Sequence, residues 1–166
     1  MGFLDLNGRY KRTVALGGTF DYLHKGHKSL IRKALQLGDR LIIGLSSDEY
    51  LSRWRKDHSV NGYEKRLEKL KSFLSELNVF DRVTIVPLDD PFGPSASDSA
   101  ISVLVVTADT LKRALEINKI RISKGLPPLQ IYVCNFILAD DGAPISSTRI
   151  RKGQIDGEGH ILEVNQ

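Results

Sequence analysis

GGTFDYLHKGH, residues 17–27, is the most informative segment of the chain. An apolar run at residues 13–16 precedes it, and residues 28–37 carry apolar side chains at helical spacing. This order predicts a buried strand, a turn, and a helix over residues 26–37 that ends with Gly38 as its C-cap. The segment is therefore expected to be the first strand-to-helix connection of an α/β protein.

The end of this connection is suited to bind an anion. His24 and His27 lie at the predicted helix start, where free N–H groups and the positive end of the helix dipole favour negative charge. Neutral imidazoles donate hydrogen bonds to phosphate oxygens without adding two permanent charges. Gly17 and Gly18 allow the backbone to approach a ligand closely, because they lack side chains. The alternative is a turn whose histidines only cap the helix or pack.

The remaining apolar runs predict an α/β fold. Strands are expected over residues 40–45, 82–87, 101–106 and 129–133, helices over 63–77 and 108–123, and a helical turn over 48–54. This alternation predicts a Rossmann-like open parallel five-stranded sheet with helices on both faces. The first two strands should be parallel neighbours. The length of 166 residues predicts a single domain over residues 1–166.

Composition excludes several classes of protein. Charged residues make up 27% and hydrophobic residues 41% of the chain, as in ordinary globular proteins. No apolar run approaches the roughly 20 residues of a membrane span, and no signal-peptide pattern is present, so we expect a cytoplasmic protein without a membrane partner. The net charge of +4 comes without a long basic run, which predicts no nucleic-acid partner. The single cysteine, Cys134, excludes an internal disulfide.

A second motif, ISSTRIR, occupies residues 145–151. Three successive hydroxyl side chains, Ser146, Ser147 and Thr148, precede a helical turn and can form an N-cap and an anion-binding nest. Arg151 can add a bidentate grip on phosphate. The alternative is an ordinary capped C-terminal helix.

The two motifs together resemble the His-x-Gly-His and Ile-Ser-Ser-Thr-x-Ile-Arg signatures of the nucleotidyltransferase superfamily. Residues 86–94 (VPLDDPFGP), residues 104–107 (LVVT) and the pair Asn118 and Arg121 narrow the resemblance. They resemble phosphopantetheine adenylyltransferases of the archaeal type and the matching domain of eukaryotic coenzyme A synthase. The likeness covers nearly all of residues 12–152.

The chain departs from this pattern in two places. Residues 107–110 read TADT where the family often has Ser-Glu-Thr, which leaves their roles open. The arginines that hold substrate at the end of the fourth strand in bacterial relatives are missing. The basic residues at 53–56 and Arg121 are the candidates to replace them.

The resemblance implies transfer of AMP from ATP to 4′-phosphopantetheine, giving dephospho-coenzyme A and pyrophosphate. The phosphate nucleophile needs no general base, so in-line displacement without a covalent enzyme intermediate is expected. Mg²⁺ should accompany ATP as its counter-ion, held mainly by phosphates and water. ATP and 4′-phosphopantetheine are the expected partners of a monomer or small homo-oligomer.

The resemblance also implies a set of site residues. For catalysis, His27 donates to the α-phosphate, Thr19 bridges the two reacting phosphates, and Lys56, with Arg53 or Arg55 as alternatives, neutralises the incoming phosphate. His24 and Arg151 hold the β- and γ-phosphates. The ATP-binding residues are Gly17, Gly18, Thr19, Phe20, His24, Gly26, His27, Ser146, Ser147, Thr148 and Arg151. The acceptor-binding residues are Asp21, Arg53, Lys56, Thr107, Asn118 and Arg121.

Two alternatives remain at this point. One is a sibling nucleotidyltransferase, which would use CTP with glycerol phosphate, or ATP with nicotinamide mononucleotide or FMN. The other is a non-catalytic module that binds nucleotides or RNA through the basic surface. Pyrophosphate release with a panel of nucleotides and acceptors distinguishes them.

Overall fold

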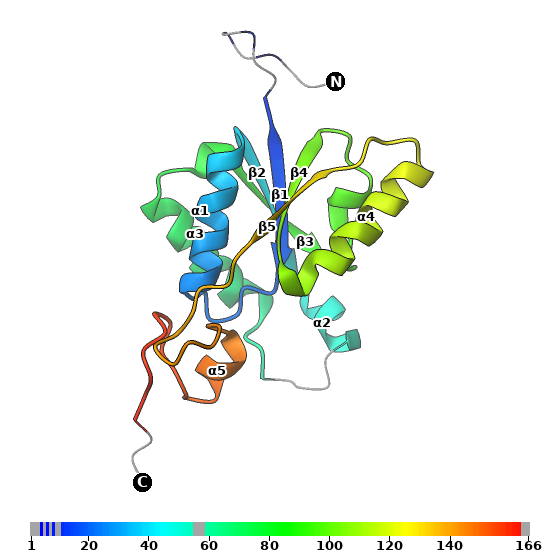
Figure 1. Cartoon of the computed structure of the whole chain (residues 1–166). Helices are drawn as coiled ribbons and strands as arrows, with labels where there is room; N and C mark the ends of the chain where they lie inside the picture. The colour runs from blue at the N-terminus through cyan, green and yellow to red at the C-terminus, as the bar shows by residue number, and fades with distance from the viewer. Residues whose placement is uncertain (1–3, 5, 7, 9–10, 55–58, 164–166) are drawn as a thin grey trace.

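The computed structural model describes residues 4, 6, 8, 11–54 and 59–163. A five-stranded parallel sheet forms its centre, in the order β3-β2-β1-β4-β5 (Figure 1). The strands are β1 (Thr13–Gly18), β2 (Arg40–Ser46), β3 (Val83–Leu88), β4 (Ile101–Thr107) and β5 (Gln130–Cys134). The predicted fold class is confirmed, and β1 and β2 are parallel neighbours as expected.

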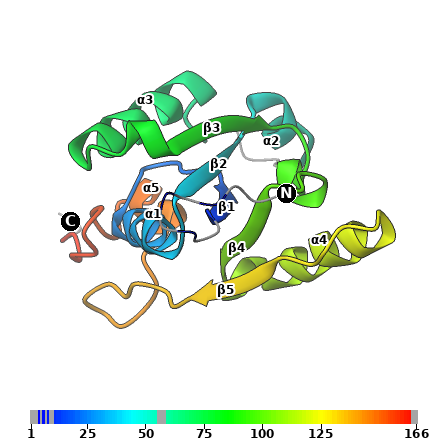
Figure 2. The same cartoon turned by 90° about the horizontal axis from the view of Figure 1, so that it is seen from above.

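Helices cover both faces of the sheet (Figure 2). Ile31 and Leu70 come from two helices on one face of the sheet and are fully buried against its strands. Ile117 comes from a third helix and packs against the opposite face of the sheet. This arrangement follows from the helical spacing of the apolar residues, which places one stripe of each helix against the strands. The three helices concerned are α1 (Lys25–Leu37), α3 (Tyr63–Glu76) and α4 (Leu111–Ser123).

Two short helices lie beyond the carboxyl ends of the strands, at the lower end of the molecule in Figure 1. They are α2 (Asp48–Trp54) and α5 (Ser147–Arg151). Because every strand pair is parallel, all five strands end at this edge. In open α/β sheets this is the edge at which ligands bind.

Three 3₁₀ turns complete the elements: η1 (Phe80–Arg82), η2 (Gly93–Ala96) and η3 (Ala108–Thr110). The turn η2 lies inside the irregular proline-containing loop that follows β3, and η3 leads from β4 into α4. Within the described ranges, no helix has the length and apolar character that a membrane span requires.

Gly38 is the C-cap residue of α1, as predicted, but its conformation differs from the usual left-handed one. This glycine has φ −158° and ψ 173°, so it is extended and does not form a left-handed C-cap. A Cβ at this position would lie 2.5 Å from Cγ2 of Val14 and 2.7 Å from the carbonyl oxygen of Arg12. The glycine is therefore required because the helix end packs closely against the chain that enters β1.

Candidate active site

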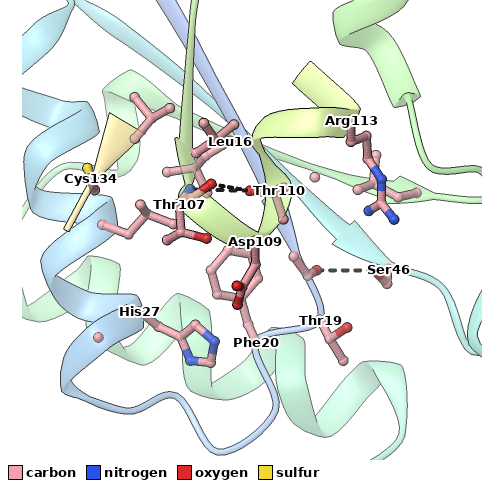
Figure 3. A pocket seen from close by; sticks show the side chains of 18 of the residues that line it. Leu16, Thr19, Phe20, His27, Ser46, Thr107, Asp109, Thr110, Arg113 and Cys134 are labelled. Carbon is pink, nitrogen blue, oxygen red and sulfur yellow. Dashed lines mark hydrogen bonds between the residues drawn. The ribbon is translucent and has the colours of Figure 1, made fainter. Parts of the chain in front are cut away.

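One cavity of about 620 Å³ opens at the carboxyl edge of the sheet. The residues of both sequence motifs line it, including His24 and His27 from the first motif and Ser146, Thr148 and Arg151 from the second. Figure 3 shows His27 and Thr19 on either side of Phe20, below the turn that joins β4 to α4. Segments more than a hundred residues apart in the chain therefore share one site.

The two histidines form a reciprocal cap at the start of α1. The Nδ1 atom of His24 accepts hydrogen bonds from the backbone N–H groups of Gly26 (3.1 Å) and His27 (3.4 Å). In return, Nδ1 of His27 accepts from the backbone N–H of His24 at 3.4 Å. Because Nδ1 is an acceptor in both rings, we assign the hydrogen of each neutral imidazole to Nε2. Each ring thus keeps one donor that the cap does not use.

Both imidazoles are neutral at physiological pH. Burial lowers the pKa of His24 to about 4. Burial, followed by repulsion from His24, lowers the pKa of His27 to about 3, against a smaller opposing effect of Asp21. The rings stack with their centroids 3.7 Å apart, a separation that would disfavour two positive charges. The prediction of neutral donors at the helix start is consistent with these shifts.

Asp21 joins the two motifs. Its carboxylate Oδ2 accepts a hydrogen bond from Nη2 of Arg151 at 2.6 Å, and its backbone carbonyl accepts one from the hydroxyl of Ser147. Its Oδ1 accepts from Nδ2 of Asn61 at 2.6 Å and from the backbone N–H of Asn61 at 3.2 Å. Hydrogen bonds from Asn61 and Arg151 outweigh burial and hold the pKa of Asp21 below its usual value.

The predicted acceptor-binding role of Asp21 is therefore not supported. The side chain is 2% exposed, and both carboxylate oxygens already accept hydrogen bonds from the protein. Ser147 is also committed to this junction, because its hydroxyl hydrogen is directed to the carbonyl of Asp21. Ser146 caps α5 by accepting from the N–H of Arg149 at 3.3 Å, and its own hydroxyl hydrogen stays available for a ligand.

The turn between β1 and α1 has an unusual backbone. Phe20 has φ 50° and Tyr22 has φ 47°, both in the left-handed region that residues with a Cβ rarely adopt. The buried ring of Phe20 packs against His27, with 5.2 Å between ring centroids. A Cβ at Gly18 would lie 3.1 Å from Cε2 of Phe20, so this glycine makes room for the ring. Gly18 thus serves the packing of the turn as well as lining the cavity.

Thr107 reaches the cavity, as predicted for the acceptor side. It ends β4, and its backbone N–H donates to Oγ1 of Thr110 at 3.2 Å (Figure 3). Arg53 differs from the prediction, because its guanidinium pairs with Glu49 on the solvent-exposed side of α2 and is not among the described lining residues. Lys56 and Arg55 lie outside the described residues.

The predicted acceptor-binding roles of Asn118 and Arg121 are wrong. The amide of Asn118 donates to the carbonyl oxygen of Leu129 at 3.0 Å and accepts from its N–H at 2.7 Å. Arg121 is completely buried and donates to four backbone carbonyls, of which that of Ile101 begins β4. Neither residue lines the cavity, and their partners lie mainly where β4 and β5 begin, although one partner of Arg121, Ser95, is itself a lining residue.

Arg113 is a cavity residue that the sequence analysis missed. It lies in the first turn of α4, and Figure 3 shows its guanidinium extending toward the side of the cavity where Thr19 and Ser46 lie. It makes no hydrogen bond or ion pair with any other residue that the structure describes. Its position just after a strand that ends at the ligand-binding edge was the available signal. In the described ranges, no group of three or more His, Cys, Asp or Glu side chains is arranged to hold a metal ion.

Comparisons with known proteins agree with this geometry. The model of the cytidylyltransferase-like family matches residues 15–153. The phosphopantetheine adenylyltransferase of Methanosarcina acetivorans is 44% identical over 156 residues, which is 92% of this chain and 97% of the relative. The chain belongs to the phosphopantetheine adenylyltransferase family. The family enzyme of Methanopyrus kandleri is 43% identical over 145 residues, covering 87% of this chain and 91% of the relative.

Solved structures of other proteins share the fold of this chain. A protein of unknown function from Archaeoglobus fulgidus is 36% identical with a TM-score of 0.65, covering 75% of this chain and 98% of that one. A structure described as a putative nicotinate-nucleotide adenylyltransferase from Vibrio parahaemolyticus, 16% identical with a TM-score of 0.54, shares the fold over 89% of this chain and 83% of its own. Both structures share the α/β architecture that the sequence pattern predicted for this chain.

Proposed function

We propose that the chain transfers AMP from ATP to 4′-phosphopantetheine, giving dephospho-coenzyme A and pyrophosphate. Family membership supports the choice of substrates. The observation that supports the chemistry is the single cavity in which His24 and His27 meet Arg151 and the hydroxyl residues of the second motif. We also propose that the reaction takes place in the cytoplasm.

The reaction needs alignment and charge stabilisation more than a base. The phosphate of 4′-phosphopantetheine carries nearly two negative charges at neutral pH and is already a nucleophile. As its oxygen bonds to the α-phosphorus, the bond to the oxygen bridging the α- and β-phosphates breaks and pyrophosphate leaves in line. Fixed donors that meet the charge spreading over the phosphoryl oxygens lower the barrier. Neutral imidazoles, hydroxyls and an arginine are such donors.

Each donor has a proposed place along the phosphate chain. His27 donates from Nε2 to the α-phosphate, and Thr19 contacts both reacting phosphates at the end of β1. His24 and Arg151 hold the β- and γ-phosphates, assisted by Thr148. Arg151 donates to Asp21 from Nη2, and its buried Nε has no partner among the described residues, so donors remain for a phosphate. The Mg²⁺ that we expect enters with ATP, because a hard cation prefers phosphate oxygens and water as ligands.

We assign the acceptor side to Arg113 and Lys56. Arg113 supplies a permanent positive charge with five N–H donors that no described residue takes up. In this proposal Arg113 contacts the phosphate of 4′-phosphopantetheine and does not contact ATP. Arg113→Met should therefore raise KM for 4′-phosphopantetheine about tenfold or more, which corresponds to a loss of about 1.4 kcal/mol of binding free energy. KM for ATP should change less. The same split is expected for Lys56→Ala, and equal effects on the two substrates would remove either residue from the acceptor side.

Pyrophosphate release tests the function directly. ATP and CTP are each combined with 4′-phosphopantetheine, nicotinamide mononucleotide, FMN and glycerol 3-phosphate. Release is expected with ATP and 4′-phosphopantetheine, together with an equal amount of dephospho-coenzyme A. Faster release with another pair would identify a sibling transferase. Salt-sensitive RNA binding without pyrophosphate release from any pair would identify a non-catalytic module.

A further inference from the structure

Arg66 of α3 is a buried arginine with three different polar partners. Its side chain is 1% exposed. Nη1 donates to the carbonyl oxygen of Thr19 at 2.9 Å, and Nε donates to the carbonyl oxygen of Asn61 at 2.8 Å. Nη2 donates to Oδ1 of Asp48 at 2.8 Å. One guanidinium therefore connects the end of β1, the start of α2 and the segment before α3.

Each of these partners leads to a different part of the cavity. Asn61, held by Arg66, holds Asp21 in turn, and Asp21 holds Arg151 of the second motif. Asp48 is the first residue of α2, and its Oδ2 accepts from the backbone N–H of Tyr63 at 2.9 Å. The starts of α2 and α3 are thus joined at one carboxylate. Tyr50, Leu51 and Trp54 of α2 line the cavity.

The backbone that Arg66 holds is the part of the site that most needs support. The carbonyl of Thr19 immediately precedes Phe20, and Tyr22 follows two residues later, both with positive φ. Such a conformation costs about 1–2 kcal/mol for each residue with a Cβ, so surrounding contacts must maintain it. Arg66 fixes the entry to this turn, and Asp21 is fixed from the same side through Asn61.

We propose that Arg66 is a positioning residue. It fixes the Thr19 turn, on the nucleotide side, relative to α2, which precedes the proposed acceptor residue Lys56 in the sequence. This inference rests on the proposed function, because it assigns the two sides from that reaction. Arg66 contacts no phosphate in this scheme. It acts on the distance and angle between the two reacting phosphates through the backbone of Thr19 and the carboxylate of Asp48.

The chain supplies a matched control for this role. Arg121 is also completely buried and also donates to backbone carbonyls, those of Ser95, Asp98 and Pro127 at 2.9 Å each. Among these partners and Ile101, only Ser95 lines the cavity, and none of them belongs to the two sequence motifs or to α2. Replacing either arginine by lysine keeps the charge and removes the planar set of donors. Both variants therefore lose buried hydrogen bonds to backbone carbonyls, and only Arg66→Lys alters the contacts of the Thr19 turn and α2.

The experiment compares Arg66→Lys with Arg121→Lys in the full chain. Melting temperatures are measured first, and then kcat and both KM values at a temperature where each variant is folded. Arg121→Lys should keep kcat within about twofold of wild type. Arg66→Lys should lower kcat by about 10- to 100-fold, the scale of a misplacement of about 1 Å, with KM for ATP within about threefold. The contacts of His24 and Arg151 with ATP explain the retained KM.

Equal kcat values for the two lysine variants would overturn the inference. If Arg66→Lys does not fold, Asp48→Ala decides, because that side chain is 59% exposed and its loss opens no cavity in the core, although it removes the carboxylate partner of Arg66. A fall in kcat at a temperature where Asp48→Ala is folded supports the positioning role, and an unchanged kcat overturns it. A wild-type protein that releases no pyrophosphate with any acceptor contradicts the proposed function instead, so the two failures are distinguishable.

Discussion

The substitution His27→Ala tests the transition-state role of the buried imidazole. The ring is neutral because burial lowers its pKa to about 3, and its Nδ1 accepts from the N–H of His24, so Nε2 is the donor. Alanine removes this donor and keeps Nδ1 of His24 as the helix cap. Loss of one transition-state donor costs about 2.7–4 kcal/mol, so kcat should fall by about 10²–10³.

The assay is the initial rate of pyrophosphate release with saturating ATP and acceptor, together with calorimetric binding of ATP to the resting enzyme. ATP affinity should change little, because His24, Arg151 and Thr148 remain. His160→Ala is the matched control, since His160 is exposed and pairs with Asp140 at 3.2 Å away from the cavity. A kcat within about threefold of wild type, on the scale of the expected loss, would refute the assignment of His27.

Two further predictions concern stability. The pKa values of His24 and His27, about 4 and about 3, lie below the unfolded value of 6.5, so the unfolded chain binds more protons below that pH. The stability is present above pH 6.5 and should fall by up to about 1.4 kcal/mol per pH unit and imidazole on acidification. Urea midpoints measured between pH 6.5 and about 4 test this pH dependence. A double variant, His24→Asn with His27→Asn, whose midpoint falls equally steeply with pH would contradict the prediction. Gly38→Ala should destabilise by about 1–3 kcal/mol, because its Cβ would overlap Val14 and a backbone oxygen. Gly157→Ala, with open space around the new Cβ, should be neutral, and equal urea midpoints for the two variants would contradict the packing argument.

Local patterns were sufficient to predict most of the fold. Apolar runs of strand length and stripes at helical spacing depend only on neighbours in sequence, and they located all five strands and the three helices that cover the sheet. The start of α1 was predicted because a helix N-terminus has chemical requirements that nearby residues meet. Gly38 shows the limit, since its requirement comes from Arg12 and Val14 on another element.

The candidate site was predictable where a motif supplied both the residue and its direction. His24, His27 and Arg151 line one cavity, as expected. The roles of arginines outside the two motifs were less predictable, because an arginine can donate either to a substrate or to backbone carbonyls. Which it does depends on carbonyls far away in sequence. Arg121 continues the buried stripe of Ala114 and Ile117, and a charged residue at such a position was the signal for an internal role.

The same signal applies to Arg66, which lies on the buried face of α3 together with Leu70, Phe73 and Leu74. A charge among buried positions of an amphipathic helix indicates a specific set of partners, because an unpaired buried charge is very costly. The partners themselves could not be inferred. They require knowing that Thr19, Asp48 and Asn61 converge, which only the folded arrangement reveals.

The junction at Asp21 has a consequence for the order in which an active protein is made. Ser147 and Arg151 reach it from 126 and 130 residues further along the chain. During synthesis, the strands up to Cys134 leave the ribosome before these two residues do. A nascent chain can therefore complete its sheet before the second motif reaches the site, and catalytic competence arrives only after residues 147–151 have emerged.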